Sequence, residues 1–193
     1  MNLSTDSSEP AVDLSQLLNL FYTEGTEHEL GRFHGVSGSQ VPEPFRELLD
    51  HHAHMTVAVE SFFGSPVDVR VVRSKKDATW YSREILLAAQ SNGLIVQYGI
   101  VRLRFGVLAD AVWQEIEGGH KPLGRVLIDH DVLRQVELVA LWRVECGPVI
   151  ANHFTVEPGT TTYGRTARIF CDSEPAIELL EIVRPLGERA VDR

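Results

Sequence analysis

Arg83 occupies the middle of a segment, TWYSREILL at residues 79–87, that is otherwise typical of a buried β-strand. Its guanidinium keeps its charge, and a buried charge without a partner is strongly destabilising. The side chain must therefore either reach solvent at a sheet edge or hold a carboxylate or phosphate. Glu84 cannot be that partner on the same face, because successive strand residues point to opposite faces. Taken alone, the segment favours a solvent-exposed edge arginine.

The composition is that of one ordinary globular domain, with 193 residues of which 44% are hydrophobic and 23% are charged. We expect a disordered tail at residues 1–12 and a single domain at residues 13–193. The formal net charge of −9 argues against nonspecific nucleic-acid binding and against a polybasic membrane surface. A small anionic ligand is compatible with this charge, provided that local arginines capture it.

The sequence carries two cysteines, Cys146 and Cys171, without the spacing of a metal site or a redox motif. The N-terminal segment MNLSTDSSEP lacks the basic and apolar regions of a secretion signal, and no apolar run approaches the length of a membrane span. These features predict a cytoplasmic protein that contacts no membrane.

Apolar residues at helical spacing predict three helices in the first third of the chain. We expect them at residues 14–21, at residues 45–49 behind Pro42 and Pro44, and at residues 55–63, where Gly64 ends the last one. The stretch between the first two helices is polar and rich in glycine, and it is interpreted as a connection.

From Val67 onward the hydrophobic period changes to two, which predicts antiparallel strands at residues 67–74, 79–89 and 94–105. Two short helices follow, at residues 109–117 and from Pro122 to Leu127. Strand patterns return at residues 135–145, 148–156 and 163–171, whereas residues 176–183 fit a strand or a helix equally well. The expected architecture is α+β, an antiparallel sheet of about six or seven strands with helices on one side.

Four segments occur in the order LLDHHAHMT, TWYSREILL, KPLGRVLI and YGRTARIF, and the last is followed by a stretch that ends in LEIVRP. This ordered set, roughly from Phe45 to Pro185, resembles the chorismate pyruvate-lyase family. The resemblance implies an antiparallel sheet whose ligand lies enclosed beneath helical flaps. It also reverses the interpretation of Arg83, which becomes the carboxylate anchor of an enclosed pocket.

The resemblance assigns five site residues. It implies that Arg83 holds the ring carboxylate of chorismate or 4-hydroxybenzoate, assisted by backbone groups at Met55 and Leu123. Glu181 corresponds to the family's glutamate at the other end of the ring, with the backbone carbonyl of Gly99 nearby. Arg83 and Glu181 are the implied catalytic residues, and neither a metal nor an organic cofactor is implied.

Two alternatives to Glu181 stay open. The stretch from Pro175 to Glu181 is one residue longer than the family pattern, and a shift of one residue inverts the facing of a strand unless a bulge absorbs it. Glu178 would then take the place of Glu181. A different alignment, which follows Pro148, puts His153 there.

The implied reaction converts chorismate to 4-hydroxybenzoate and pyruvate, driven by aromatisation of the ring. The protein would hold the dianion in a reactive pose, exclude water and help to remove a ring proton. Two alternatives remain: a non-catalytic binding module for a small aromatic carboxylate, and an enzyme of the same fold that acts on another carboxylated substrate. In each case the partner is a small anionic aromatic or cyclohexadienyl carboxylate.

The remaining polar clusters are interpreted as surface features. His51, His52 and His54 lack further ligands at a convincing spacing, which favours a solvated helix end over a metal site. Arg165 and Arg168 alternate with apolar neighbours and are likewise assigned to the surface.

Overall fold

A computed structural model describes residues 12–23 and 25–187, so the tail predicted at residues 1–12 lies outside the described residues except for Val12. Its centre is one seven-stranded sheet in which every pair of neighbours is antiparallel, with the order β1-β5-β6-β7-β4-β3-β2. This confirms the expected α+β fold. The strands are β1 (Gly31–Val36), β2 (Val67–Lys76), β3 (Trp80–Ala89), β4 (Ile95–Arg104), β5 (Arg134–Cys146), β6 (Thr161–Cys171) and β7 (Glu174–Val183).

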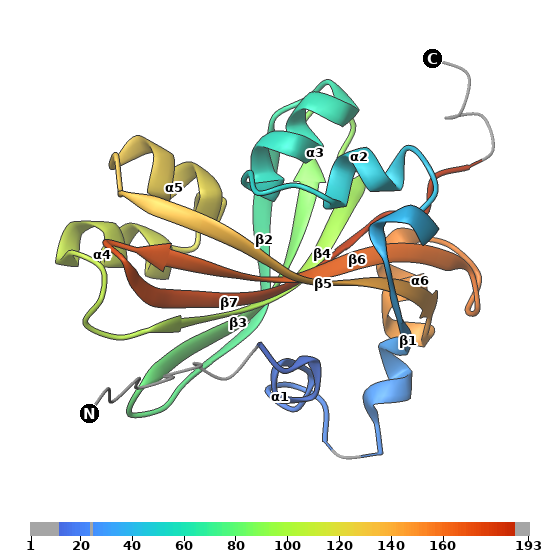
Figure 1. Cartoon of the computed structure of the whole chain (residues 1–193), viewed down its shortest axis with the longest axis horizontal. Helices are drawn as coiled ribbons and strands as arrows, with labels where there is room; N and C mark the ends of the chain where they lie inside the picture. The colour runs from blue at the N-terminus through green and yellow to red at the C-terminus, as the bar shows by residue number, and fades with distance from the viewer. Residues whose placement is uncertain (1–11, 24, 188–193) are drawn as a thin grey trace, which may run out of the picture.

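Helices cover both faces of this sheet and not one side as expected, because two helices lie opposite the other four (Figure 1). Four lie on the face that will carry the site, as the resemblance implied: α2 (Phe45–Leu49), α3 (Met55–Phe63), α4 (Asp110–Gly118) and α5 (Leu123–Asp129). The opposite face packs against α1 (Leu14–Leu18) and α6 (Pro148–Phe154). Two 3-10 turns, η1 (Glu27–Glu29) and η2 (Gly38–Gln40), flank β1.

The two-sided cover explains the continuous apolar run in β3, because a strand that is buried on both faces needs apolar residues at nearly every position. Ile85 and Leu87 pack with α2 and α3, whereas Leu86 belongs to the core beneath α1 and α6. Strand alternation therefore puts Arg83 on the face of α2–α5 and Glu84 on the face of α1 and α6.

Of the two helices above the site, α3 begins and ends where the sequence predicts, and α5 begins there but extends two residues beyond the predicted end at Leu127. Gly64 follows α3 with a φ of 61°, in the left-handed region that glycine adopts easily. Pro122 precedes the first turn of α5. Gly124 in that turn lies so close to α3 that a Cβ atom would stand 2.8 Å from the Thr56 hydroxyl oxygen, so the contact between the helices depends on glycine.

Two predictions about individual elements were wrong. The polar connection at residues 25–40 contains β1, an edge strand that pairs with β5 and shows no regular apolar alternation. Residues 148–154 of the expected strand at 148–156 form α6, in which Pro148 takes the first helical turn and Ile150, Ala151 and Phe154 form its buried stripe. The ambiguous segment at residues 176–183 is a strand, paired with β4 and β6.

Both cysteines are buried and free. Within the described residues, no helix is long and apolar enough to cross a bilayer.

Candidate functional site

A pocket lies between the sheet face formed by β3, β4 and β7 and the N-terminal ends of α3 and α5. Its empty space is about 500 Å³ when the part that opens to solvent is included. The walls are mainly apolar and include Met55, Ile85, Leu87, Val101, Leu123 and Leu179. Such walls suit a small organic ligand, while the few polar groups among them determine its orientation.

Arg83 is the charged group at one end of this pocket and is only 1% exposed. Its Nη1 atom donates a hydrogen bond to the backbone oxygen of Ile116 at 2.9 Å, and its buried Nε has no partner among the described residues. No described carboxylate forms an ion pair with it. Burial lowers the pKa of Arg83, with Tyr81 the main group that opposes this shift. The guanidinium is thus a buried cation without an anion.

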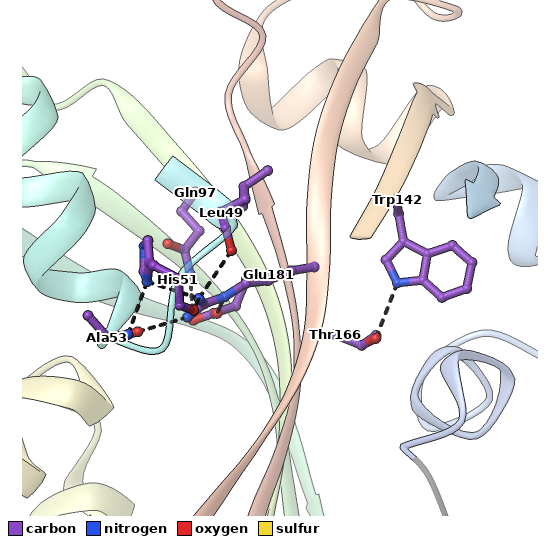
Figure 2. Close-up of polar contacts among 8 residues, drawn as sticks. Leu49, His51, Ala53, Gln97, Trp142, Thr166 and Glu181 are labelled. Atoms are coloured by element: carbon purple, nitrogen blue, oxygen red, sulfur yellow. Dashed lines mark hydrogen bonds and ion pairs between the residues drawn. The ribbon is translucent and has the colours of Figure 1, made fainter. Parts of the chain in front are cut away.

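Glu181 lines the same pocket from β7, where it is paired in register with Gly99 of β4. Its Oε2 accepts a hydrogen bond from Arg165 Nε at 2.8 Å, and its Oε1 accepts a longer one from Gln97 Nε2 at 3.4 Å. Figure 2 shows Glu181 and Gln97 beside the chain between α2 and α3. The carboxylate is therefore neutralised by a protein cation before any ligand enters.

Arg165 connects this carboxylate to the loop at residues 50–54, which leads into α3. It is 1% exposed, and its guanidinium donates to the backbone oxygens of His51 at 2.9 Å and Ala53 at 3.2 Å. A third, longer contact reaches the backbone oxygen of Leu49 at 3.4 Å (Figure 2). Its assignment to the surface was therefore wrong. Arg165 positions this loop, whose last residue, His54, lines the pocket together with Met55, the first residue of α3.

The structure brings all five predicted site residues together, since Arg83, Met55, Gly99, Leu123 and Glu181 line this one pocket. Their roles toward a ligand stay predictions, but their positions are now defined. Glycine at position 99 keeps the pocket open, because a Cβ there would stand 3.3 Å from Ile85 Cδ1 and fill part of the pocket floor.

The geometry also separates Glu181 from its alternatives. Between β6 and β7 the register shifts so that Ala176 is skipped, and this bulge absorbs the extra residue. Glu178 consequently lies on the opposite face, in an ion pair with Arg102. His153 also lies on that face, where its ring stacks on Tyr98 with centroids 6.2 Å apart.

Sequence reasoning missed Gln97, which lines the pocket, and the role of Arg165, which holds Glu181 and the loop at residues 50–54. Both could have been found from strand alternation, because Gln97 stands two residues before Gly99 and Arg165 two residues before the buried Ala167. A polar residue in phase with the buried positions of a strand is a candidate for a site.

The histidine cluster is divided: His52 is exposed as predicted, whereas His54 is half-buried and lines the pocket. His52 contacts the backbone oxygen of Val136 at 3.1 Å, and His54 accepts a hydrogen bond from Arg134. Burial, aided by the charges of Arg134 and Arg165, lowers the pKa of His54 to about 4. Among the described residues, no group of three or more His, Cys, Asp or Glu side chains is placed to hold a metal ion.

Comparisons with known proteins gave matches among solved structures alone. No family model matches the sequence, and no curated protein matches it. The structural matches include a ligand-binding domain assigned to a GntR-family transcriptional regulator from Bordetella bronchiseptica, with 15% identity, a TM-score of 0.46, and 63% of this chain and 86% of that chain covered.

Two further matches are domains of the same kind. The effector domain of PhnF from Mycobacterium smegmatis has 11% identity and a TM-score of 0.46, covering 68% of this chain and 88% of that one. The C-terminal domain of the histidine utilization repressor from Pseudomonas syringae has 10% identity and a TM-score of 0.43, covering 63% and 96%. At these identities the likeness concerns the fold alone.

These findings correct the expected activity. The matching structures named above are domains of transcriptional regulators, and nothing in the sequence comparisons supports a chorismate pyruvate-lyase, so the prediction of that enzyme was wrong. The alternative of an enzyme for another carboxylated substrate is overturned with it. A physical reason lies in the site: Glu181, the expected base, is occupied by Arg165 and Gln97. What the resemblance predicted correctly is the fold, which does not determine chemistry.

Proposed function

We propose that this chain is a non-catalytic binding module for a small aromatic carboxylate, held in the pocket between the sheet and helices α3 and α5. One observation carries the proposal: Arg83 is 1% exposed, lines the pocket, and has no carboxylate partner among the described residues. A buried guanidinium is costly to leave unpaired, so the site is poised for an anion from outside the chain.

The form of the pocket favours a carboxylate attached to an apolar ring. Nη1 of Arg83 donates to the backbone oxygen of Ile116, whereas Nε has no partner among the described residues and can donate to a ligand. Charge-assisted hydrogen bonds of this kind are about twice as strong as neutral ones. The walls that follow are aliphatic, with Leu123 above the sheet and Val101 within it. A flat ring can displace water from these walls while its carboxylate stays at Arg83.

The same fold serves as a ligand-binding or effector domain in the regulators named above. We extend that role to this chain as part of the proposal, so that the domain reports the presence of its ligand and does not consume it. Support for this comes from the unpaired arginine in the pocket and not from the likeness in fold.

Calorimetric titration with 4-hydroxybenzoate tests the proposal. Arg83→Met keeps much of the side-chain volume but removes the charge, and we expect it to weaken binding by about 1.5–3 kcal/mol, the worth of a charge-assisted hydrogen bond. Arg104→Met is the matched control, because Arg104 is exposed at the end of β4 and does not line the pocket. Its affinity for the ligand should equal that of the wild type.

Two outcomes would contradict the proposal. Unchanged affinity in Arg83→Met would show that the arginine does not hold the carboxylate. Formation of 4-hydroxybenzoate and pyruvate from chorismate, faster than the spontaneous reaction and dependent on Glu181, would show that the site is catalytic.

A further inference from the structure

Gln97 presents a buried acceptor to the end of the pocket opposite Arg83. It is 2% exposed, lines the pocket from β4, and its Oε1 has no hydrogen-bond partner among the described residues. A buried carbonyl oxygen without a donor is unusual, since most buried polar atoms are paired and an unpaired one costs free energy. Gln97 Oε1 is therefore available to accept a hydrogen bond from a donor outside the described residues.

The orientation of the Gln97 amide is determined by its neighbour. Its Nε2 donates to Glu181 Oε1 at 3.4 Å. The Glu181 carboxylate, already held by Arg165, can only accept, so turning the amide over would set two acceptors against each other. The amide oxygen must consequently point away from Glu181.

Glu181 retains acceptor capacity beside this oxygen. Arg165 occupies Oε2 at 2.8 Å, but the bond from Gln97 to Oε1 is long, and a carboxylate oxygen accepts more than one hydrogen bond. The far end of the pocket thus offers two acceptors from adjacent strands. Because Arg165 neutralises the carboxylate, the pair of acceptors favours a neutral donor with two hydrogens over an added cation.

We propose that Gln97 is a specificity-determining residue that selects ligands with an N–H donor group at the end opposite their carboxylate. This inference rests on the proposed function of the pocket. A planar amino group has two N–H bonds and can satisfy Gln97 and Glu181 together. A hydroxyl group has one hydrogen and can donate to only one of the two acceptors, and an unsubstituted ring donates to neither.

The spacing of the two ends requires an elongated ligand. Arg83 is paired in register with Val101, which stands four residues along β4 from Gln97. At ~3.3 Å per residue the two strand positions are about 13 Å apart, a distance that the two long side chains must shorten for a one-ring ligand to reach both. A ring with its two polar groups in para positions is the compact ligand that meets both ends.

The test compares three probes that share one ring and one carboxylate: 4-aminobenzoate, 4-hydroxybenzoate and benzoate. Titrated into the full chain, 4-aminobenzoate should bind about three- to tenfold more tightly than 4-hydroxybenzoate, with benzoate the weakest. Gln97→Met removes the acceptor and keeps the length of the side chain, and it should reduce the preference for the amine to less than about twofold. Gln114→Met, on the exposed side of α4, is the control and should leave the order unchanged.

The wild-type ranking needs no variant, so the inference is testable even if Gln97→Met does not fold. If 4-hydroxybenzoate binds as tightly as 4-aminobenzoate, or if the preference survives in Gln97→Met, the inference about Gln97 is wrong. The proposed function then still stands, provided that Arg83→Met weakens binding of all three probes. If none of the three binds the wild type, both proposals fail.

Discussion

At the scale of single residues, β3 carries two adjacent buried charges, of which one is paired within the protein and the other is not. Arg83 faces the pocket without an ion-pair partner among the described residues, whereas Glu84 on the other face has one ion pair and two hydrogen bonds. Its carboxylate accepts from the hydroxyls of Tyr22 at 2.8 Å and Tyr98 at 2.7 Å, and it forms an ion pair with Arg73. Glu84 is therefore a structural residue, and strand alternation alone separates it from the site.

The buried charge of Glu84 affects the pKa values of Tyr22 and Tyr98. Burial, together with the hydrogen bond to Glu84 and the charge of Glu84, raises the pKa of Tyr22 to about 12. Burial with the charge of Glu84 raises the pKa of Tyr98 well above its usual value. Both hydroxyls thus stay protonated and continue to donate to Glu84. Removing either one leaves a buried carboxylate short of a donor.

Tyr98→Phe should accordingly destabilise the protein by about 1–3 kcal/mol, because the ring is retained but a hydrogen bond to a buried charge is lost. Tyr163→Phe is the matched control, since the Tyr163 ring packs on Phe45 at 4.9 Å and its hydroxyl makes no hydrogen bond to a described residue. It should cost less than about 0.5 kcal/mol. Urea unfolding measures both values, and equal losses in the two variants would show that the bond to Glu84 contributes nothing specific.

At the scale of elements, the site depends on the loop at residues 50–54 between α2 and α3. Its backbone oxygens are held by Arg165, and His54 at its end accepts a hydrogen bond from Arg134. Two arginines thus surround a neutral imidazole, and a proton on that ring would be repelled by both. The order of the loop, and with it the pocket wall at Met55, is sensitive to this proton.

This predicts a pH dependence of stability with a defined sign. The pKa of His54 falls from 6.5 to about 4 on folding, so between these values the unfolded chain binds a proton that the folded chain does not. The stabilising contribution is complete above pH 6.5 and is lost as the pH falls toward 4. Because the side chain is partly exposed, we expect a loss of about 1–2 kcal/mol.

The unfolding free energy should be measured by urea titration at intervals across this window. His54→Gln keeps an acceptor for Arg134 without a group that titrates there, so its stability should fall less steeply with acid than that of the wild type. His120→Gln, which changes an exposed histidine, should follow the wild-type slope. Parallel slopes in the wild type and in His54→Gln would rule out the role given to His54.

How far the sequence predicts these elements depends on how they are buried. The apolar patterns of β2, β3 and β4 were sufficient to predict those strands, and Gly64 and Pro122 marked helix boundaries correctly. The edge strand β1 was missed because it is half-covered and lacks alternation. The bulge at Ala176, which turns Glu181 into the pocket, follows from pairing with β6 and leaves no local signal in the sequence.

The site, too, has features that the sequence could predict and features that depend on how the strands pair. Strand alternation alone could have identified Arg165 and Gln97, but their relation to Glu181 depends on the order of β6, β7 and β4 in the sheet. Periodicity within one segment contains no information on which strands become neighbours. The resemblance to a lyase family supplied that arrangement and, with it, an activity that the fold does not require.

At the scale of the whole molecule, the hydrophobic core is divided by the sheet into two parts, one on each face. On one face, Phe154 of α6 and Leu17 of α1 pack with Ile182. On the other face, α2–α5 cover the pocket and its surroundings. The central strands contribute side chains to the core on both faces. If the core on one face is lost, the core on the other face loses the sheet against which it packs. We therefore expect the chain to unfold as a single domain in one transition.

Phe154→Ala tests this coupling from the face that has no pocket. Phe154 is fully buried, and its truncation should cost about 3–5 kcal/mol. At ~2–4 °C per kcal/mol for a chain of this size, the melting temperature should fall by roughly 6–20 °C. Since the central strands are shared, the pocket face should melt at the same lowered temperature.

Two single-tryptophan proteins can report the faces separately. Trp113 on α4 packs with Tyr81 on the pocket side, and Trp142 belongs to the opposite core, where it donates to Thr166 (Figure 2). In a single domain, Phe154→Ala shifts both fluorescence transitions equally, and ligand at a hundred times its Kd raises both by the equivalent of about 2.7 kcal/mol. A Trp113 transition that stays at its original temperature while that of Trp142 falls would mean that the two faces fold independently. The pocket would then respond to its ligand without involving the rest of the molecule.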